Sequence, residues 1–291
     1  MPTFLMPALA LMVNALIFGI SWWPFRELQG HGLHPLWATA LTFVVSLTGL
    51  MLIRPGAWRG LLQYPMLWLL VIASGLTNVG FNWAVTVDDV VRVVLLFYLM
   101  PAWVLLLAWP LLRERPGAGS LFRLSLALAG LVVVLKTPAS PWPVPDSMTD
   151  WLALMGGFCF ALTNVLLRRL NHTPGDARTL AMFVGGAVMS SAAALAGMQL
   201  GVVTAPPTHG GTWIGLAVLL SLALLIGNLA LQYGAARLRA TATSLIMLSE
   251  VVFASVSSVL LGAAELSTRT VLGGALIMLA ALLSVFSSDS A

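Results

Sequence analysis

Residues 66–85 read MLWLLVIASGLTNVGFNWAV, a run that contains no charged side chain. An α-helix rises 1.5 Å per residue, so about 20 apolar residues cross the hydrocarbon core of a bilayer. A run of this length and composition is typical of a transmembrane helix rather than of a helix in a soluble protein.

The same pattern recurs along the whole chain of 291 residues. The apolar runs are residues 4–25, 35–53, 66–85, 90–111, 121–136, 151–170, 180–200, 211–234, 240–261 and 271–287. They predict an all-α integral membrane protein with ten transmembrane helices.

The overall composition agrees with this class of protein. Hydrophobic residues make up 59% of the chain and charged residues only 8%, whereas a soluble domain carries about 25% charged residues. The net charge of +4 comes from arginines scattered between apolar runs. Arginines in this pattern set the orientation of a protein in the membrane, so no nucleic-acid partner is expected. A single cysteine, Cys159, excludes an internal disulfide.

The arginines alternate between the two sides of the predicted membrane helices. The richer side holds Arg54, Arg59, Arg113, Arg115, Arg123, Arg168, Arg169, Arg178, Arg237 and Arg239, and the poorer side holds Arg26, Arg92, Lys136 and Arg269. Because positive loops stay in the cytoplasm, we expect a bacterial inner-membrane protein with both termini cytoplasmic.

The chain also divides into two similar halves. A proline-rich segment at 137–150 predicts a linker, so the two units are residues 1–140 and 141–291. Phe18-Gly19 is followed seven positions later by Arg26, and Phe160-Ala161 by Arg168 at the same interval. Each half has five helices, an odd number, so the second half is expected to be inverted in the membrane.

These motifs resemble those of the drug/metabolite transporter superfamily, in its EamA-type branch. The residues that carry the resemblance are Phe18-Gly19, Arg26, His34-Pro35, Pro101 and Glu114 in the first half, and residues 248–253, Leu261-Gly262, Glu265 and Gly274 in the second. Three positions depart from the family pattern: Phe18 replaces Trp, Arg26 replaces Lys, and Val251 replaces Pro. The resemblance implies a secondary transporter of two inverted five-helix repeats.

The first predicted helical hairpin resembles one particular branch of this superfamily. Residues 21–39, which begin SWWPFRE, are most similar to the aromatic amino acid exporters of this superfamily. This similarity implies export of small hydrophobic metabolites, aromatic or other hydrophobic amino acids first, by alternating access through a central cavity. Nucleobases, drugs or another metabolite are the alternative cargo in the same fold.

Polar side chains within the apolar runs are the candidates for a substrate site, because they are costly in a membrane. Asn78 and Asn82 share a helix face, as do Asn228 and Gln232, and each residue lies 150 positions from its counterpart. Such carboxamides can donate to a carboxylate and accept from an ammonium group. They can equally hold helices together through hydrogen bonds.

Glu250 is a carboxylate well inside a predicted helix. Burial disfavours its charged form, so Glu250 could bind a proton or a substrate ammonium group during transport. It could also stay protonated as a packing element.

The full set of predicted site residues includes aromatic rings and helix kinks. The predicted substrate-binding residues are Asn78, Asn82, Trp83, Tyr98, Trp22, Asn164, Asn228, Gln232 and Tyr233; Glu250 is the possible coupling residue, and Pro24 and Pro101 are the predicted kinks or gates. Aromatic rings favour a flat apolar cargo through stacking, although each ring can also pack in the core or face lipid.

Other classes of function find little support in the sequence. His31 and His34 lie in a loop without other metal ligands, so neither a metal nor a cofactor is expected. Nothing resembles an ATP-binding motif. An intramembrane enzyme would need a nucleophile and a base that converge, and a non-transporting scaffold would have little need of matched polar faces. No obligatory protein partner is inferred.

Overall fold

All ten predicted runs are helical in the structure, a computed structural model that describes residues 4–87, 90–135, 145–207, 212–263, 265 and 267–286. Within these residues nine helices are long and apolar enough to cross a membrane, and the tenth run forms a shorter apolar helix, Thr268–Ser284. The prediction of an all-α membrane protein is therefore confirmed. Residues 136–144, which contain most of the predicted linker and Lys136, lie outside the described residues, as does the side chain of Arg92.

The helices keep the order of the runs. The first half contains α1 (Leu5–Ile20), α2 (Trp22–Gly30), α3 (Pro35–Ile53), α4 (Ala57–Gln63), α5 (Met66–Val87), α6 (Val90–Phe97), α7 (Met100–Leu112) and α8 (Ala118–Leu135). The second half contains α9 (Met148–Arg169), α10 (Gly175–Gln199), α11 (Thr212–Ala235), α12 (Ala240–Met247), α13 (Ser249–Leu260) and α14 (Thr268–Phe286). The first, fourth and ninth runs are each interrupted, which yields α1 and α2, α6 and α7, and α12 and α13.

Two features of the chain differ from the sequence prediction. The break after Ile53 contains the short helix α4, which buries Ala57, Gly60 and Leu61 and packs on α10. Helix α10 begins at Gly175 rather than at residue 180, so Arg178 lies inside a helix and is buried. Its guanidinium donates to the Leu170 and Thr173 carbonyls, which is why a charged residue is tolerated there.

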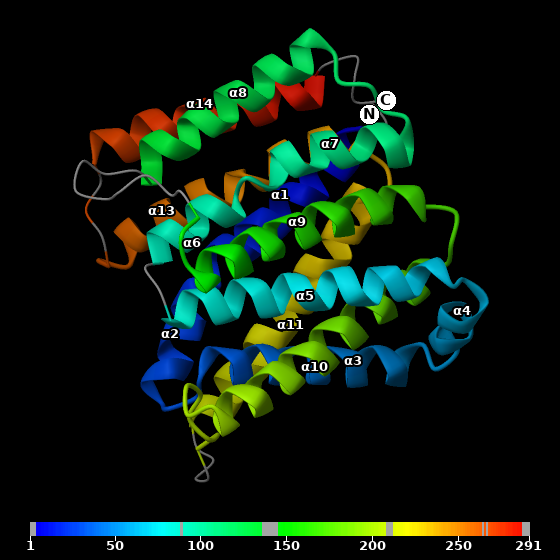
Figure 1. The fold of residues 1–291 in the computed structure, drawn as a ribbon, viewed down its shortest axis with the longest axis vertical. Coiled ribbons are helices and arrows are strands. Elements are labelled where there is room, and N and C mark those ends of the chain that lie inside the picture. The colour runs from blue at the N-terminus through cyan, green and yellow to red at the C-terminus, as the bar shows by residue number, and fades with distance from the viewer. Residues whose placement is uncertain are drawn as a thin grey trace.

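The pattern of helix packing relates the two halves by an inverted symmetry (Figure 1). The first helix of each half packs on the third helix of the other, as the pairs α1–α11 and α5–α9. The second helices, α3 and α10, pack on each other, and so do the fifth helices, α8 and α14. The beginning of α1 and the end of α14 lie at the same end of the molecule. The halves are therefore interleaved rather than side by side.

Close helix contacts depend on glycines at these crossings. A Cβ on Gly130 of α8 would lie 2.6 Å from the Gly273 carbonyl oxygen of α14, and the reverse distance is also 2.6 Å. A Cβ on Gly80 of α5 would lie 2.7 Å from the Leu152 carbonyl oxygen of α9. Small residues at these positions let the backbones approach, as membrane helix packing requires.

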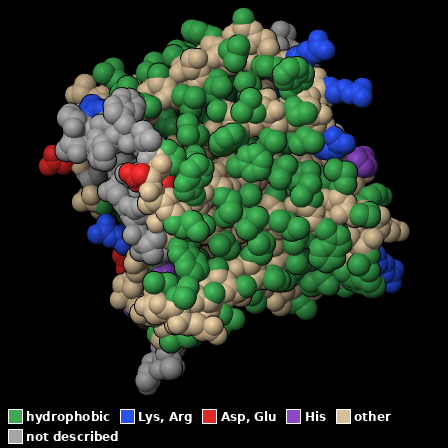
Figure 2. Space-filling view, in the orientation of Figure 1, with side chains coloured by type: hydrophobic (Ala, Val, Ile, Leu, Met, Phe, Trp, Pro, Cys, Tyr) green, Lys and Arg blue, Asp and Glu red, His purple; other side chains and the backbone are tan. Residues whose placement is uncertain are grey.

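The outer surface matches a protein surrounded by lipid. Figure 2 shows a broad face covered mainly by apolar side chains, with most of the visible arginines along one edge. Arg54, Arg59, Arg113, Arg169 and Arg237 are exposed, and each lies close to a helix end. We call this end of the molecule the arginine-rich end.

Candidate functional site

The fourth transmembrane helix of each half is interrupted, and the two breaks fall at equivalent positions. The fourth run stops at Phe97 and resumes at Met100, and the ninth stops at Met247 and resumes at Ser249. Tyr98 and Leu248, which occupy the breaks, are 150 positions apart, as are the carboxamides predicted from sequence. Broken helices at the same level in two inverted repeats are where transporters commonly form their binding sites.

The two breaks have different local causes. Pro101 has no N–H to bond the carbonyl of Phe97, so the helix is interrupted just before it. Val251 stands at the corresponding position of the second half, and its N–H bonds the Leu248 carbonyl at 3.1 Å instead of continuing the α-helical pattern. The Ser249 hydroxyl donates to the Ile246 carbonyl at 2.6 Å. A tight turn therefore interrupts the helix in the second half, whereas a proline interrupts it in the first half.

Tyr98 and Glu250 connect the two breaks. The Tyr98 hydroxyl donates a hydrogen bond to the Glu250 carboxylate. The Tyr98 ring is buried with Leu248 and Val251, whereas Glu250 is partly exposed. One residue from each half thus forms a polar pair at the level where both helices are interrupted.

Aromatic rings surround the Tyr98 side of this pair. Phe97 lies 4.7 Å from Phe81, 5.5 Å from Tyr98 and 5.7 Å from Phe160 between ring centroids, and the Phe97 and Phe160 rings are stacked. Phe81, Phe97 and Phe160 belong to α5, α6 and α9, and Tyr98 lies in the break after α6. We call Phe81, Phe97, Tyr98 and Phe160 the aromatic cluster.

Asn78 and Asn228, the first residues of the two carboxamide pairs predicted from sequence, make equivalent hydrogen bonds. Asn78 donates to the Ser74 carbonyl and Asn228 to the Leu224 carbonyl, each at 2.8 Å and one turn back on its own helix. Asn82 is half-buried on α5. Asn78 and Asn228 therefore satisfy part of their hydrogen bonding within their own helices.

Gln232 and Trp83 contact different parts of α10. Gln232 donates to the Thr179 hydroxyl, near the beginning of α10. Trp83, next to Asn82, approaches Gly197 near the end of α10. Thr179 and Gly197 are about 27 Å apart along a helix that rises 1.5 Å per residue. Gln232 and Trp83 therefore lie toward opposite ends of α10.

Two other predicted aromatic residues make specific contacts away from the breaks. Trp22 on α2 donates through Nε1 to the Ser257 hydroxyl on α13 at 2.9 Å. Tyr233 is exposed, and the guanidinium of Arg237 lies 3.9 Å from its ring centroid. Tyr233 therefore faces the arginine-rich end rather than the Tyr98–Glu250 pair.

Asn164 has a counterpart that the sequence prediction did not include. Asn164 on α9 donates to the Met100 sulfur at 3.9 Å, next to the first break. Asn14 on α1 donates to the Gly227 carbonyl at 2.8 Å. Both side chains are fully buried, and their Oδ1 atoms have no hydrogen-bond partner among the described residues. The offset of 150 between them is the sequence signal that could have identified Asn14 as a site residue.

The prolines predicted as kinks both follow interruptions. Pro24 lies in the first turn of α2, three positions after Ser21, where the first run is interrupted. Pro101 lies at the start of α7, three positions after Tyr98. Both interruptions fall where a proline removes a helical hydrogen bond.

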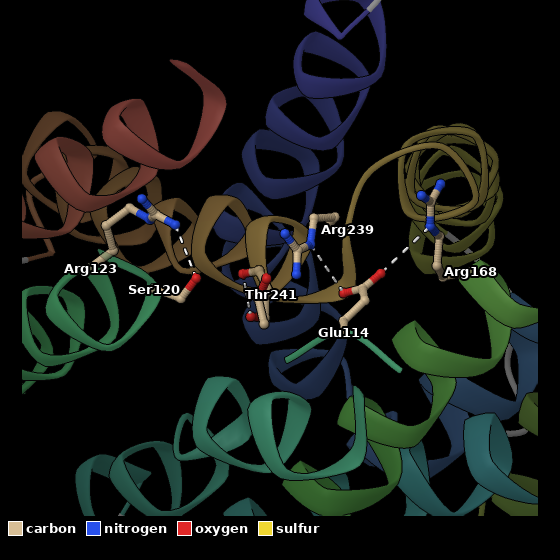
Figure 3. Close-up of polar contacts among 7 residues, drawn as sticks. Glu114, Ser120, Arg123, Arg168, Arg239 and Thr241 are labelled. Carbon is tan, nitrogen blue, oxygen red and sulfur yellow. Dashed lines mark hydrogen bonds and ion pairs between the residues drawn. The ribbon is translucent and has the colours of Figure 1, made fainter. Parts of the chain in front are cut away.

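An ion-pair network joins the two halves at the arginine-rich end (Figure 3). Glu114, which follows α7, lies 3.9 Å from Nε of Arg168 at the end of α9 and 3.7 Å from Nε of Arg239 before α12. Burial raises the pKa of Glu114, although Arg239 and Arg168 lower it. This end of the molecule is also held by contact between α7 and α12, whereas α6 and α13 make no comparable contact with each other among the described residues.

The described residues contain no cluster of three or more His, Cys, Asp or Glu side chains that could hold a metal ion. His31 and His34, the two histidines considered from sequence, lie in the turn between α2 and α3, where the His34 ring accepts a hydrogen bond from the Leu36 N–H at 3.2 Å. His34 therefore caps α3.

Comparison with known proteins agrees with this architecture. A family model described as the EamA-like transporter family matches the chain twice, over residues 5–136 and 147–286. A solved structure known only as "Crystal structure of protein" has a TM-score of 0.77 and 18% identity, over 95% of this chain and 96% of that chain. At that identity the likeness shows the fold alone. No curated protein sequence matches the chain.

The fold and the paired helix breaks define a polytopic membrane protein of transporter type, built from a duplicated five-helix repeat. Because the family model covers both halves, the chain belongs to the EamA-like transporter family. It is accordingly a secondary transporter for a small molecule and not an enzyme.

Proposed function

We propose that the protein exports small hydrophobic metabolites, with aromatic and other hydrophobic amino acids as the first candidates. The cargo binds at the paired helix breaks, and the protein works by alternating access. It resides in a bacterial inner membrane with both termini in the cytoplasm, as the distribution of arginines predicts.

The observation that carries this proposal is the Tyr98–Glu250 pair beside the aromatic cluster. An amino acid has an ammonium group that a carboxylate attracts, and Glu250 supplies that carboxylate. The rings of Phe81, Phe97 and Phe160 offer a surface on which a flat apolar side chain can stack. A charged group next to an aromatic surface thus suits a hydrophobic amino acid better than a sugar or an inorganic ion.

Unequal packing at the two ends of the broken helices supports alternating access. Contact between α7 and α12, with the Glu114 ion pairs, closes the arginine-rich end, while α6 and α13 lack comparable contact with each other in the part of the chain that the structure describes. Rocking of one repeat against the other would exchange these two arrangements.

The separated carboxamides fit the same proposal as successive contacts. Asn78, Asn82 and Trp83 would meet the cargo on the side opposite the arginine-rich end, and Asn228 and Gln232 would meet it on the arginine-rich side. Asn164 would contact it from α9, next to the first break. Each set would serve one half of the transport path.

The test is uptake by proteoliposomes that contain the purified protein. Radiolabelled tryptophan, phenylalanine, alanine, adenine and lysine are supplied separately, with and without an imposed pH gradient. We expect saturable uptake of tryptophan and phenylalanine that the unlabelled amino acids inhibit. A response to the pH gradient would assign proton coupling, with Glu250 as the candidate residue.

Protein-free liposomes provide the background for this experiment. Saturable uptake of adenine without uptake of any amino acid would replace the proposed cargo with a nucleobase. If none of the five compounds entered above background, the cargo assignment would be wrong, while the membership of the transporter family would stand.

A further inference from the structure

A large basic hollow opens at the arginine-rich end, separate from the paired helix breaks. It has a volume of about 740 Å³. Its lining residues are Met66, Leu111, Leu112, Arg113, Glu114, Arg115, Arg168, Arg169, Asn171, His172 and Arg239. The lining contains five arginines against one carboxylate, which leaves an excess of four formal positive charges. We call it the basic hollow.

The arginines enter the basic hollow from both halves of the chain. Arg113 and Arg115 lie between α7 and α8 in the first half, whereas Arg168, Arg169 and Arg239 belong to the second half. Figure 3 shows Arg168 and Arg239 on either side of Glu114, to which both point.

Glu114 satisfies only part of this charge. Its single negative charge is shared between Arg168, with Nε at 3.9 Å, and Arg239, with Nε at 3.7 Å. Arg169 is exposed and uses one N–H on the Leu111 carbonyl. Arg113 and Arg115 are exposed and have no ion-pair partner within the described part of the chain. A guanidinium has five N–H donors, so Arg113, Arg115 and Arg169 have donors available to a ligand.

The level of the basic hollow in the membrane is fixed by the helices around it. Leu112 and Arg169 end two of the candidate spans, and Met66 begins another. The hollow therefore lies where phospholipid headgroups meet the protein, and where soluble anions also have access.

We propose that the basic hollow binds a phosphate-type anion. Guanidinium groups match the geometry of phosphate oxygens and can bind them in bidentate fashion. The positive-inside bias explains why arginines are on this side, but it does not require them to gather around one hollow: Arg54 and Arg59 are on the same side and do not line it. The phosphate group belongs either to an anionic lipid or to a soluble phosphate ester, and the experiment distinguishes these two sources.

The experiment measures binding to the purified, delipidated full-length protein in detergent, without any transport assay. The probes are phosphatidylglycerol and glycerol 3-phosphate, with phosphatidylcholine as the zwitterionic comparison, and complexes are counted by native mass spectrometry. The variant carries Arg115→Gln and Arg169→Gln, which leave the Glu114 ion pairs intact. The matched control carries Arg54→Gln and Arg59→Gln, which remove the same charge from the same side outside the hollow.

We expect the native protein and the Arg54/Arg59 control to bind an anionic probe equally, within about twofold. The Arg115/Arg169 variant should bind it about tenfold or more weakly, because hydrogen bonds between charged groups are lost. Preference for phosphatidylglycerol over both other probes would assign a lipid headgroup, and binding of glycerol 3-phosphate would assign a soluble ester. Size-exclusion profiles verify that each variant is folded.

The proposal would be overturned in either of two ways. The native protein could bind neither anionic probe better than phosphatidylcholine. Alternatively, both double variants could lose binding equally, which would mean that general surface charge and not the hollow attracts the anion.

Discussion

Glu114 is a single carboxylate whose surroundings act on it in opposite directions. Burial raises its pKa, and this effect exceeds the lowering by Arg239 and Arg168. The folded protein therefore holds the Glu114 proton more tightly than the unfolded chain does. Its contribution to stability is complete below the unfolded pKa of about 4.3, and it is lost as pH rises through the higher folded pKa.

The variant Glu114→Gln stays neutral and should remove this contribution to the pH dependence. We expect the thermal midpoint of the native protein to fall more than that of the variant between about pH 4 and pH 8, measured by unfolding in detergent. Glu265→Gln, which changes an exposed glutamate, serves as the control. An unchanged pH slope in the Glu114 variant would contradict this account of its environment.

At the scale of single residues, the sequence identified pairs of polar side chains but not their level along the helices. Asn78 and Asn228 are 150 positions apart, and both side chains bond one turn back on their own helices. The sequence could not show that Gln232 and Trp83 lie near opposite ends of α10. In an inverted repeat, counterparts lie on opposite sides unless they are near the midplane, as the residues of the helix breaks are.

At the scale of helices, the packing of α8 on α14 depends on glycine. A Cβ at Gly130 would lie 2.6 Å from a backbone oxygen, which cannot move like a flexible side chain. Gly130→Ala should therefore destabilise the protein by roughly 1–3 kcal/mol. Thermal unfolding in detergent, together with the yield of monodisperse protein, provides the measurement.

The control for this prediction is Gly49→Ala in α3, where a Cβ would meet nothing within 4 Å. Because alanine is favoured over glycine inside a helix by roughly 0.5–1 kcal/mol, this variant should be as stable as the native protein or more so. Equal stability of the two variants would show that the α8–α14 contact is looser than described here.

The sequence could predict only some of the helix interruptions. Pro101 indicated the break in the fourth run, because proline cannot complete the helical pattern. Nothing of this kind was present in the ninth run, where Val251 occupies the matching position and a hydroxyl and a short turn cause the break. The short helix α4 was also missed, since seven residues produce little periodic signal.

At the scale of the whole molecule, hydrophobic run length was sufficient to predict the helices, because each span must satisfy its backbone hydrogen bonds internally. The interleaving of the halves was not predictable in detail. It depends on which glycines, such as Gly80 and Gly130, meet which backbone across the repeats.

The distribution of arginines gives a prediction for orientation in the membrane. A green fluorescent protein fused to the C-terminus should fluoresce, because that end is expected in the cytoplasm. Alkaline phosphatase fused after residue 140, in the predicted linker, should be active in the periplasm. Reversed signals from the two fusions would contradict the predicted orientation while leaving the helix count intact.

The most direct test of the central claim, that the paired helix breaks carry the transport site, is the initial rate of phenylalanine uptake by proteoliposomes. Native protein is compared with Glu250→Gln at the break and with Glu265→Gln, an exposed glutamate of the same half. We predict that Glu250→Gln lowers the rate at subsaturating substrate by about tenfold or more, through loss of the charged partner of the ammonium group, and that Glu265→Gln matches the native rate. Native rates in a folded Glu250→Gln protein would contradict the claim.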